Sequence, residues 1–366
     1  MNKYLGAGGS VTQLEQAFAA KMGTKYAVAM NSGTATLHAT LLAMGIGPGD
    51  EVIVPALGPI MTAAAVIQAG AKPVFCDVEP LTFTMDIRGD LWKKLSPQTK
   101  AVISVALYGL PCRLDELQDI CEERQLWHIE DNAQCVLSTF RDHLVGQYSD
   151  VASYSFEQSK HINCGEGGMI TADDPGLARE IRNVANHGYA CMTSTGSRLP
   201  KETIQQPGYK RHNRIGWNYR LAEHLAEIAL EQVNRLDDIV RQRQRVARAL
   251  RIVLQDYPFF SLQVVPGDRT HSYYALGAAY HDDYGVSWKE FYDRYKALGG
   301  DGIYGGWVVP YHEPAIAELG FGDHCPGAEY LAPRLMQFPT NETDPVALAK
   351  KVGALRVLCE DISRGK

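Results

Sequence analysis

The stretch AVISVALYGLPCRLDELQDICEERQLWHIED, residues 101–131, decides the fold class. It contains an apolar run at 101–107, a helical pattern at 114–124 and a second apolar run at 127–129. A strand, a crossover helix and another strand in this order are typical of parallel strands in an α/β sheet. Both apolar runs are continuous rather than alternating, and this favours strands that are buried on both faces.

The same alternation extends toward the N-terminus. Ser10 and Gln13 form a capping-box pattern that predicts the start of a helix, and Gly23 predicts its end. After residue 150 the pattern changes, because two further apolar runs follow each other without a long helix between them. We therefore predict a mostly parallel sheet that becomes mixed, with strands at 26–30, 52–54, 74–76, 101–107, 127–129, 151–156 and 169–171.

The C-terminal part begins with a helical pattern. Apolar residues from Leu221 to Val240 recur at helical spacing, which predicts one long amphipathic helix. The run Arg241-Gln242-Arg243-Gln244-Arg245 continues it, and such charged runs are usually solvated helix faces. Beyond it, helical stretches mix with short apolar runs. We predict a large domain at 1–245 and a smaller C-terminal α/β domain at 246–366.

Composition narrows the class of protein. The chain has 366 residues, 45% of them hydrophobic and 21% charged, which is typical of a folded globular protein. A net charge of −6 has the wrong sign for a protein whose main ligand is nucleic acid. The eight cysteines form no Cys-x-x-Cys pair, and the histidines show no metal-ligand spacing, so we predict no metal. No signal-peptide pattern or membrane span is evident, and we expect a cytoplasmic protein.

Chemistry is expected at the carboxyl ends of the strands, where ligands of α/β sheets bind. After the first strand, residues 31–36 (NSGTAT) open a helix that suits either a phosphate or a plain N-cap. Asp131 ends the strand near residue 129, and Lys160 follows the strand at 151–156, close to the glycines at 165–168. A phosphate cradle, a carboxylate and a nucleophilic lysine on neighbouring strand ends are what pyridoxal phosphate (PLP) chemistry requires.

Six segments, in this order, resemble the DegT/StrS family of fold-type-I, PLP-dependent aminotransferases that act on keto sugars and cyclitols. The resemblance extends over most of the chain and implies the large and small α/β domains of that fold. The segments are NSGTATL from Asn31, GIGPGDEVIVPAL from Gly45, AKPVFCDVEPLTFTMD from Ala71, IEDNAQ from Ile129, SYSFEQSKHINCGEGGMIT from Ser153 and GWNYRLAE from Gly216.

The resemblance also implies roles for individual residues. Lys160 is the lysine that forms the Schiff base and moves the proton, and Asp131 is the partner of the pyridinium nitrogen. The remaining roles concern the cofactor's hydroxyl side and phosphate. Gln134 is expected at the ring hydroxyl, Ser155 and the helix start Gly33-Thr34-Ala35 at the phosphate, and Asn218 at the phosphate of a neighbouring subunit. A homodimer with shared active sites follows from that last role.

Two positions depart from the family pattern. Pro59 stands where relatives commonly place an aromatic residue over the cofactor ring, and Ala106 stands where they often have histidine. A subgroup of the family has histidine in place of the lysine and carries out a dehydration. Because Lys160 rather than His161 has the catalytic spacing, transamination is favoured. A PLP-dependent keto-sugar dehydratase and a non-catalytic PLP-binding regulator remain the alternatives.

The sequence leaves the substrate open between a sugar ketone, nucleotide-linked or free, and a cyclitol ketone. The segment SFEQSK is closer to the cyclitol branch of the family. Four basic residues before the predicted long helix suit either a nucleotide diphosphate or the phosphate of the cofactor together with solvent. These residues are Lys210, Arg211, Arg214 and Arg220. The resemblance implies glutamate or glutamine as the amino donor.

Overall fold

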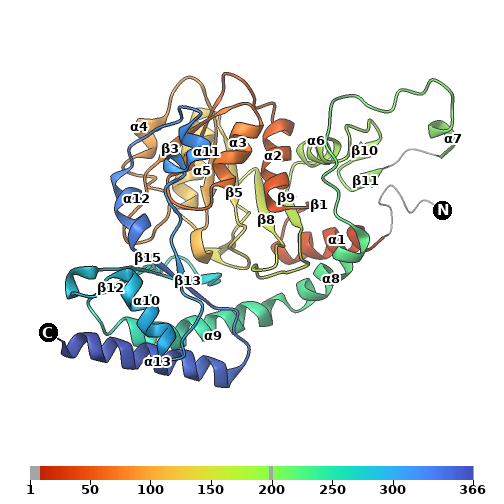
Figure 1. Ribbon diagram of the computed structural model, residues 1–366. Coiled ribbons are helices and arrows are strands. Elements are labelled where there is room, and N and C mark those ends of the chain that lie inside the picture. The colour runs from red at the N-terminus through yellow and green to blue at the C-terminus, as the bar shows by residue number, and fades with distance from the viewer. Residues whose placement is uncertain (1–8, 198–200, 366) are drawn as a thin grey trace.

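A seven-stranded sheet forms the centre of the molecule in the computed structural model, which describes residues 9–197 and 201–365 (Figure 1). Its strand order is β1-β9-β8-β5-β4-β2-β3. All neighbouring pairs are parallel except those of β9, which runs antiparallel to both β8 and β1. The predicted mostly parallel, mixed sheet is therefore confirmed. The strands are β1 (Tyr26–Met30), β2 (Glu51–Pro55), β3 (Lys72–Cys76), β4 (Thr99–Val105), β5 (Trp127–Asp131), β8 (Val151–Ser155) and β9 (Gly168–Ala172).

Helices cover both faces of this sheet because successive strand residues point to opposite sides. In β2, Ile53 belongs to one apolar core, whereas Val52 and Val54 belong to another. The first core is closed by α1 (Ser10–Met22), α5 (Leu114–Arg124) and α8 (Glu223–Asn234), and the other face is covered by α2 (Gly33–Ala43), α3 (Met61–Gln68) and α6 (Pro175–Ala185). The short helix α4 (Leu91–Lys94) precedes β4.

The strand register brings the carboxyl ends of the central strands to one edge. Val105 of β4 pairs with Asp131 of β5, and Asp131 pairs with Ser153 of β8. Ser155, the last residue of β8, therefore lies two residues beyond the level of Asp131. The segments that follow β4, β5 and β8 meet above this edge.

A second sheet with the order β12-β13-β15-β14 lies below the first one in Figure 1. It packs with α9, α10 and α13 around its own apolar core. The helices α11 and α12 instead contribute residues to a core of the large sheet. The elements are α9 (Leu236–Leu254), β12 (Phe260–Leu262), β13 (Ala275–Tyr280), α10 (Trp288–Ala297), β14 (Tyr304–Gly305), α11 (Pro314–Ala317), α12 (Pro326–Leu331), β15 (Leu335–Pro339) and α13 (Pro345–Arg364).

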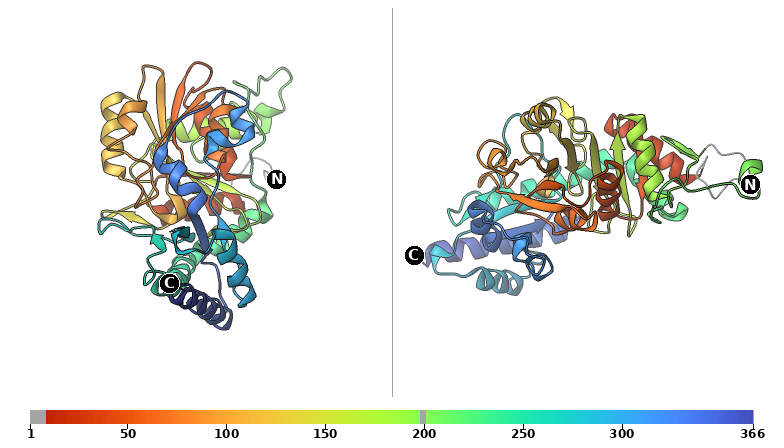
Figure 2. Two further views of the ribbon diagram at one scale, coloured as in Figure 1. Left: turned by 60° about the vertical axis from the view of Figure 1, so that its left-hand side comes forward. Right: turned by 90° about the horizontal axis from the view of Figure 1, so that it is seen from above.

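The domain division after residue 245 lies within α9, whose residues join both cores. Leu236 and Val240 belong to a core of the large sheet, whereas Val246 and Leu250 belong to the core of the second sheet. Figure 2 shows α9 and α13 side by side beneath the large sheet. The division into residues 1–245 and 246–366 stays a prediction.

Two details of the predicted helices were wrong. The long helix from Leu221 is divided into α8 and α9, because Arg235 between them has a non-helical conformation (φ −116°, ψ 21°). The predicted capping box is absent at the start of α1: Gly9 is the N-cap, and the Ser10 hydroxyl donates to Glu227 of α8 instead. In both cases a tertiary arrangement decides the local structure.

The chain also forms a projection at the edge of the large sheet, beyond β1 and α6. It carries the hairpin β10 (Met192–Thr193) and β11 (Gly196–Ser197) and the short helix α7 (Lys201–Ile204), and it extends away from the rest of the chain in all views (Figures 1 and 2). A second small hairpin, β6 (Thr139–Phe140) with β7 (His143–Leu144), follows β5. None of the helices in the described part of the chain has the length and hydrophobicity needed to cross a bilayer.

Candidate active site

Asp131 is a buried carboxylate at the end of β5, with 6% of its surface exposed. The hydroxyl of Thr62, the second residue of α3, donates to Oδ2 at 2.8 Å, and the amide of Ala133 donates to Oδ1 at 3.1 Å. Burial raises the pKa of Asp131, while these two hydrogen bonds and the positive charge of Lys160 act in the opposite direction. The carboxylate is thus held in one orientation, with Lys160 as its cationic neighbour.

Lys160 follows β8 in a tight turn, in which its amide donates to the carbonyl of Glu157 at 2.9 Å. Its side chain is half-buried, and Nζ lies 4.5 Å from the ring centroid of Tyr274. The carbonyl of Lys160 accepts a hydrogen bond from the Arg243 guanidinium at 2.8 Å. The lysine is therefore fixed at its backbone while its amine remains close to Asp131.

Gln134 is 2% exposed and uses only one end of its amide. Its Oε1 accepts a hydrogen bond from the backbone amide of Tyr108 at 2.8 Å. Among the described residues its buried Nε2 has no hydrogen-bond partner. A buried donor without a partner costs free energy, so this position suits a bound acceptor.

The start of α2 approaches the end of β8 very closely. The Ser32 side chain caps the helix by accepting from the amide of Ala35, and Thr34 lies in the first turn. A Cβ atom at Gly33 would lie only 2.9 Å from Cβ of Ser155, so this approach requires glycine. The N-terminus of α2, with its positive dipole end, and the Ser155 hydroxyl thus face one region that suits an anion.

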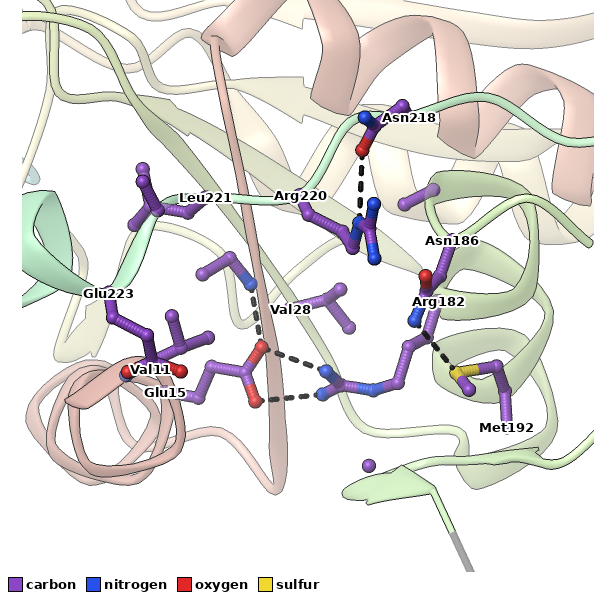
Figure 3. A pocket seen from close by; sticks show the side chains of 14 residues that line it. Val11, Glu15, Val28, Arg182, Asn186, Met192, Asn218, Arg220, Leu221 and Glu223 are labelled. Atoms are coloured by element: carbon purple, nitrogen blue, oxygen red, sulfur yellow. Dashed lines mark hydrogen bonds and ion pairs between the residues drawn. The ribbon is translucent and has the colours of Figure 1, made fainter. Parts of the chain in front are cut away.

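In the described part of the chain, the Asn218 side chain forms no hydrogen bond with Asp131, Lys160, Gln134 or Ser155. It is exposed, and its Oδ1 accepts a hydrogen bond from Arg220 Nε at 2.9 Å. Its backbone carbonyl accepts from the side chain of Asn31, just ahead of α2. Both Asn218 and Arg220 line a cavity of about 390 Å³ next to β1 (Figure 3).

The floor of this cavity contains a buried ion pair. Arg182 of α6 donates two hydrogen bonds of 2.9 Å to the Glu15 carboxylate of α1, and Glu15 also accepts from the amide of Ala29 (Figure 3). Of the candidate cofactor-binding residues, only Asn218 belongs to the described lining. The structure therefore brings Asp131, Lys160, Gln134, Ser155 and the start of α2 to one edge of the sheet, whereas the Asn218 side chain lines the cavity next to β1.

Three residues near the site were missed by the sequence predictions. Thr62 orients Asp131, Tyr274 contacts the amine of Lys160, and Arg243 binds the carbonyls of Ser159 and Lys160. The prediction of a solvated face was wrong for Arg243, which is 5% exposed. Its spacing from Leu236 and Val240 places it on the apolar stripe of α9, a signal that was present in the sequence.

The four basic residues before α8 have different surroundings. Arg214 donates to the carbonyl of Leu42 and pairs with Glu180, and Arg220 contacts Asn218 and His187. Lys210 is exposed. Internal contacts therefore already account for Arg214 and Arg220.

Residues 1–343 match the DegT/DnrJ/EryC1/StrS aminotransferase family. The chain belongs to this family. The match confirms the resemblance carried by the six segments, and it agrees with the enzyme class that they imply. Among solved structures, an aminotransferase from Psychrobacter cryohalolentis is 28% identical, with a TM-score of 0.86 over 97% of this chain and 92% of that one. This likeness confirms the predicted fold class.

Two curated relatives are similar in sequence. GDP-perosamine synthase of Caulobacter vibrioides is 39% identical over 236 residues, which are 64% of this chain and 59% of that protein. The spore coat polysaccharide biosynthesis protein SpsC of Bacillus subtilis is 35% identical over 276 residues, 74% of this chain and 68% of that protein. The similarity to the first relative thus spans about three fifths of its length.

Proposed function

We propose that this chain is a PLP-dependent aminotransferase that moves an amino group from glutamate or glutamine to the ketone of a sugar, nucleotide-linked or free, or of a cyclitol. The observation that carries the proposal is that the buried Asp131, on which the charge of Lys160 acts, lies at one sheet edge with Gln134 and the start of α2. Family membership and the names of the two polysaccharide-related relatives support a sugar substrate in amino-sugar biosynthesis.

The residues at the site fit the cofactor chemically. The Nε2 of Gln134 is a buried donor that lacks a partner among the described residues, and it suits the ring hydroxyl of PLP. The close approach of Gly33 to Ser155 forms a cradle that suits the phosphate. When bound, PLP supplies an electron-withdrawing ring that makes the carbon beside the donor's amino group acidic.

The residues of the chain then have distinct tasks. The Asp131 carboxylate, oriented by Thr62, holds a proton on the ring nitrogen. With PLP present, Lys160 Nζ would hold the cofactor, and in its free form the amine would move a proton from the substrate carbon to the cofactor carbon. The donor leaves as its keto acid, and the ketone of the second substrate becomes an amine.

His161 is a poor candidate for the dehydratase chemistry. It is 3% exposed, and its Nε2 lies 3.1 Å from the carbonyl of Ser272. Burial and the charge of Arg243 lower the pKa of His161 well below its ordinary value. These contacts favour a structural histidine, and transamination by Lys160 therefore remains the better proposal.

We further propose a cytoplasmic homodimer in which Asn218 reaches the phosphate site of the partner subunit. The exposed side chain of Asn218, on the segment that adjoins the projection, supports this arrangement. The eight cysteines are all free thiols, which suits a reducing compartment.

The test is the visible absorption spectrum of the purified protein, recorded before and after glutamate and then glutamine are added. We expect a band from lysine-bound PLP that collapses with one of the two donors and is missing in Lys160→Ala. A band that neither donor changes would favour the dehydratase or regulatory alternatives. If added PLP produces no band, the proposed cofactor is wrong.

A further inference from the structure

The amine of Lys160 has a defined contact that the proposed chemistry does not use. Its Nζ lies 4.5 Å from the centroid of the Tyr274 ring. A cation at this distance from an aromatic face is attracted by the negative charge density of the ring. Tyr274 directly precedes β13 of the second sheet. The lysine that follows β8 of the large sheet is therefore contacted by a residue from the C-terminal part of the chain.

The hydroxyl of Tyr274 is held in place by a short chain of hydrogen bonds. Ser159 Oγ donates to Glu157 Oε2 at 2.5 Å and lies 3.0 Å from the Tyr274 hydroxyl. Because the single proton of Ser159 is used for the carboxylate, the Tyr274 hydroxyl donates to Ser159 Oγ. The ring is therefore anchored to the same turn that carries Lys160.

The backbone of Tyr274 is anchored as well. Its amide donates to the carbonyl of Tyr108 at 2.8 Å, and its carbonyl accepts from Arg243 at 3.0 Å and from Thr340 at 2.9 Å. The same guanidinium binds the carbonyls of Ser159 and Lys160. Arg243 thus fixes the distance between the ring and the lysine from the backbone side.

We propose that Tyr274 is a positioning residue for Lys160, whose ammonium rests on the face of the tyrosine ring whenever the amine is not joined to the cofactor. The proposal deepens the proposed function and rests on Lys160 being the cofactor lysine. During amino transfer the free lysine would carry a proton between two carbon atoms, and the ring would stabilise the ammonium in between. The ring accepts no proton from Nζ, and no bond to Tyr274 forms.

Other charged or titratable groups also surround Lys160. They are Asp131 at the end of β5, Glu157 in the same turn, His161 next in the chain and Arg243 on α9. All of them remain in variants of Tyr274. A change in the reactivity of the Lys160 amine in such variants therefore measures the effect of the Tyr274 ring.

The experiment measures how fast Lys160 is acetylated by acetic anhydride in the cofactor-free protein as a function of pH, with the labelled peptide quantified by mass spectrometry. In Tyr274→Leu we expect acetylation of Lys160 to be about tenfold faster at pH values where the wild-type amine reacts slowly, because the ammonium loses its contact with the ring. Tyr274→Phe keeps the ring and is expected to keep the wild-type rates.

Tyr273→Leu is the matched control, because Tyr273 is the preceding residue and stacks on His271 instead of contacting Lys160. It should leave the acetylation rate of Lys160 unchanged. The proposal is overturned if Tyr274→Leu keeps the wild-type rate, if Tyr274→Phe reacts as fast as Tyr274→Leu, or if the Tyr273 control is accelerated equally. Should Tyr274→Leu not fold, Tyr274→Met provides the same comparison.

A second measurement uses the holoenzyme. We expect kcat of Tyr274→Leu to fall about tenfold while KM for the donor is unchanged, with kcat largely restored in Tyr274→Phe. A drop in KM and kcat together in both variants would contradict the positioning role. Because the acetylation profile is measured without cofactor, a failure of the proposed aminotransferase activity would not mimic a failure of this inference.

Discussion

At the scale of single residues, Gln134 and Asp131 show how the site depends on polar groups whose interactions are incomplete. Gln134 satisfies its carbonyl end through Tyr108, while its donor end has no partner among the described residues. Asp131 is buried, and within the described ranges two hydrogen bonds hold its charge. A fold without a ligand at this edge would gain stability from apolar residues at both positions.

The first prediction concerns Asp131 in the reaction. In Asp131→Ala, turnover should fall by about a hundredfold or more, since the charge that holds the proton on the ring nitrogen is lost. The affinity for PLP should change far less, because the start of α2 and Ser155 remain. Steady-state kinetics and a PLP titration measure the two effects, and comparable turnover in the variant would refute the assigned role.

The second prediction concerns the pH dependence of stability in the cofactor-free protein. Burial raises the pKa of Asp131, so the folded state keeps a proton in a pH range where the unfolded chain has lost it. Folding is therefore favoured below the ordinary pKa of the group, and this contribution is lost as pH rises through the raised value. The asparagine side chain does not titrate, so Asp131→Asn lacks this pH-dependent contribution to stability.

The free energy of unfolding of Asp131→Asn, relative to that of the wild type, should consequently increase with pH above the ordinary pKa of aspartate. The increase should level off above the raised pKa of Asp131. Urea unfolding of both cofactor-free proteins between about pH 4 and pH 8 measures this difference. A difference that does not vary with pH would show that Asp131 has an unperturbed pKa in the folded state.

At the scale of elements, the contact between α2 and β8 determines where an anion binds. In Gly33→Ala, the new Cβ would lie 2.9 Å from Cβ of Ser155 and push the helix start away from the strand end. We expect PLP affinity to fall about tenfold or more, while the sheet remains folded. Fluorescence titration with PLP tests this.

Gly47→Ala is a suitable control for the glycine variant. Gly47 lies beyond the other end of α2, and its new Cβ would lie 3.7 Å from the nearest atom, the carbonyl oxygen of Ala69. Equal losses of affinity in both variants would mean that the geometry at the start of α2 is not what holds the cofactor.

Helix α9 is the second element with a direct effect on the site. Arg243 is buried and supplies hydrogen bonds to the carbonyls of Ser159, Lys160 and Tyr274. In Arg243→Ala these acceptors lose their donor, and we expect a loss of about 3 kcal/mol in the free energy of unfolding. The neighbouring Arg245 is exposed, so Arg245→Ala should change stability by less than about 0.5 kcal/mol. Urea unfolding of the two variants compares them, and similar values would contradict the structural role of Arg243.

The elements also show which parts of the fold were predictable. The bounds of α5 match the predicted helix, and the ends of β1 were predicted correctly, because local patterns and turn residues specify them. The start of α1 was not predictable, since the Ser10 hydroxyl donates to Glu227 of α8, and no local sequence signal marks the break at Arg235. In the site, Lys160 and Asp131 follow strands and were found in the sequence, but Tyr274 comes from a distant segment.

At the scale of the whole molecule, the open point is whether two chains share each site. If Asn218 serves the site of the partner subunit, as proposed, a Lys160→Ala subunit and an Asn218→Ala subunit should each be impaired alone. After the two are mixed under conditions that exchange subunits, half of the dimers are mixed, and each has one native site. Activity should then recover to about a quarter of the wild-type value.

This recovery distinguishes the two arrangements directly. If Asn218 acts within its own chain, the mixed dimer contains no native site and activity stays at the level of the separate variants. Wild-type protein taken through the same exchange procedure serves as the control for losses on handling.

The anchoring of the Lys160 turn by α9 and by the residues around Tyr274 has a consequence for synthesis on the ribosome. The sheet edge with Asn31, Asp131 and Ser155 is complete once residue 172 has been added, yet the donors and the ring that hold the lysine turn come from residues 243, 274 and 340. A nascent chain therefore gains its sheet early and its ordered lysine late. Cofactor capture is expected to be one of the last events in the maturation of this protein, after nearly the whole polypeptide has left the exit tunnel.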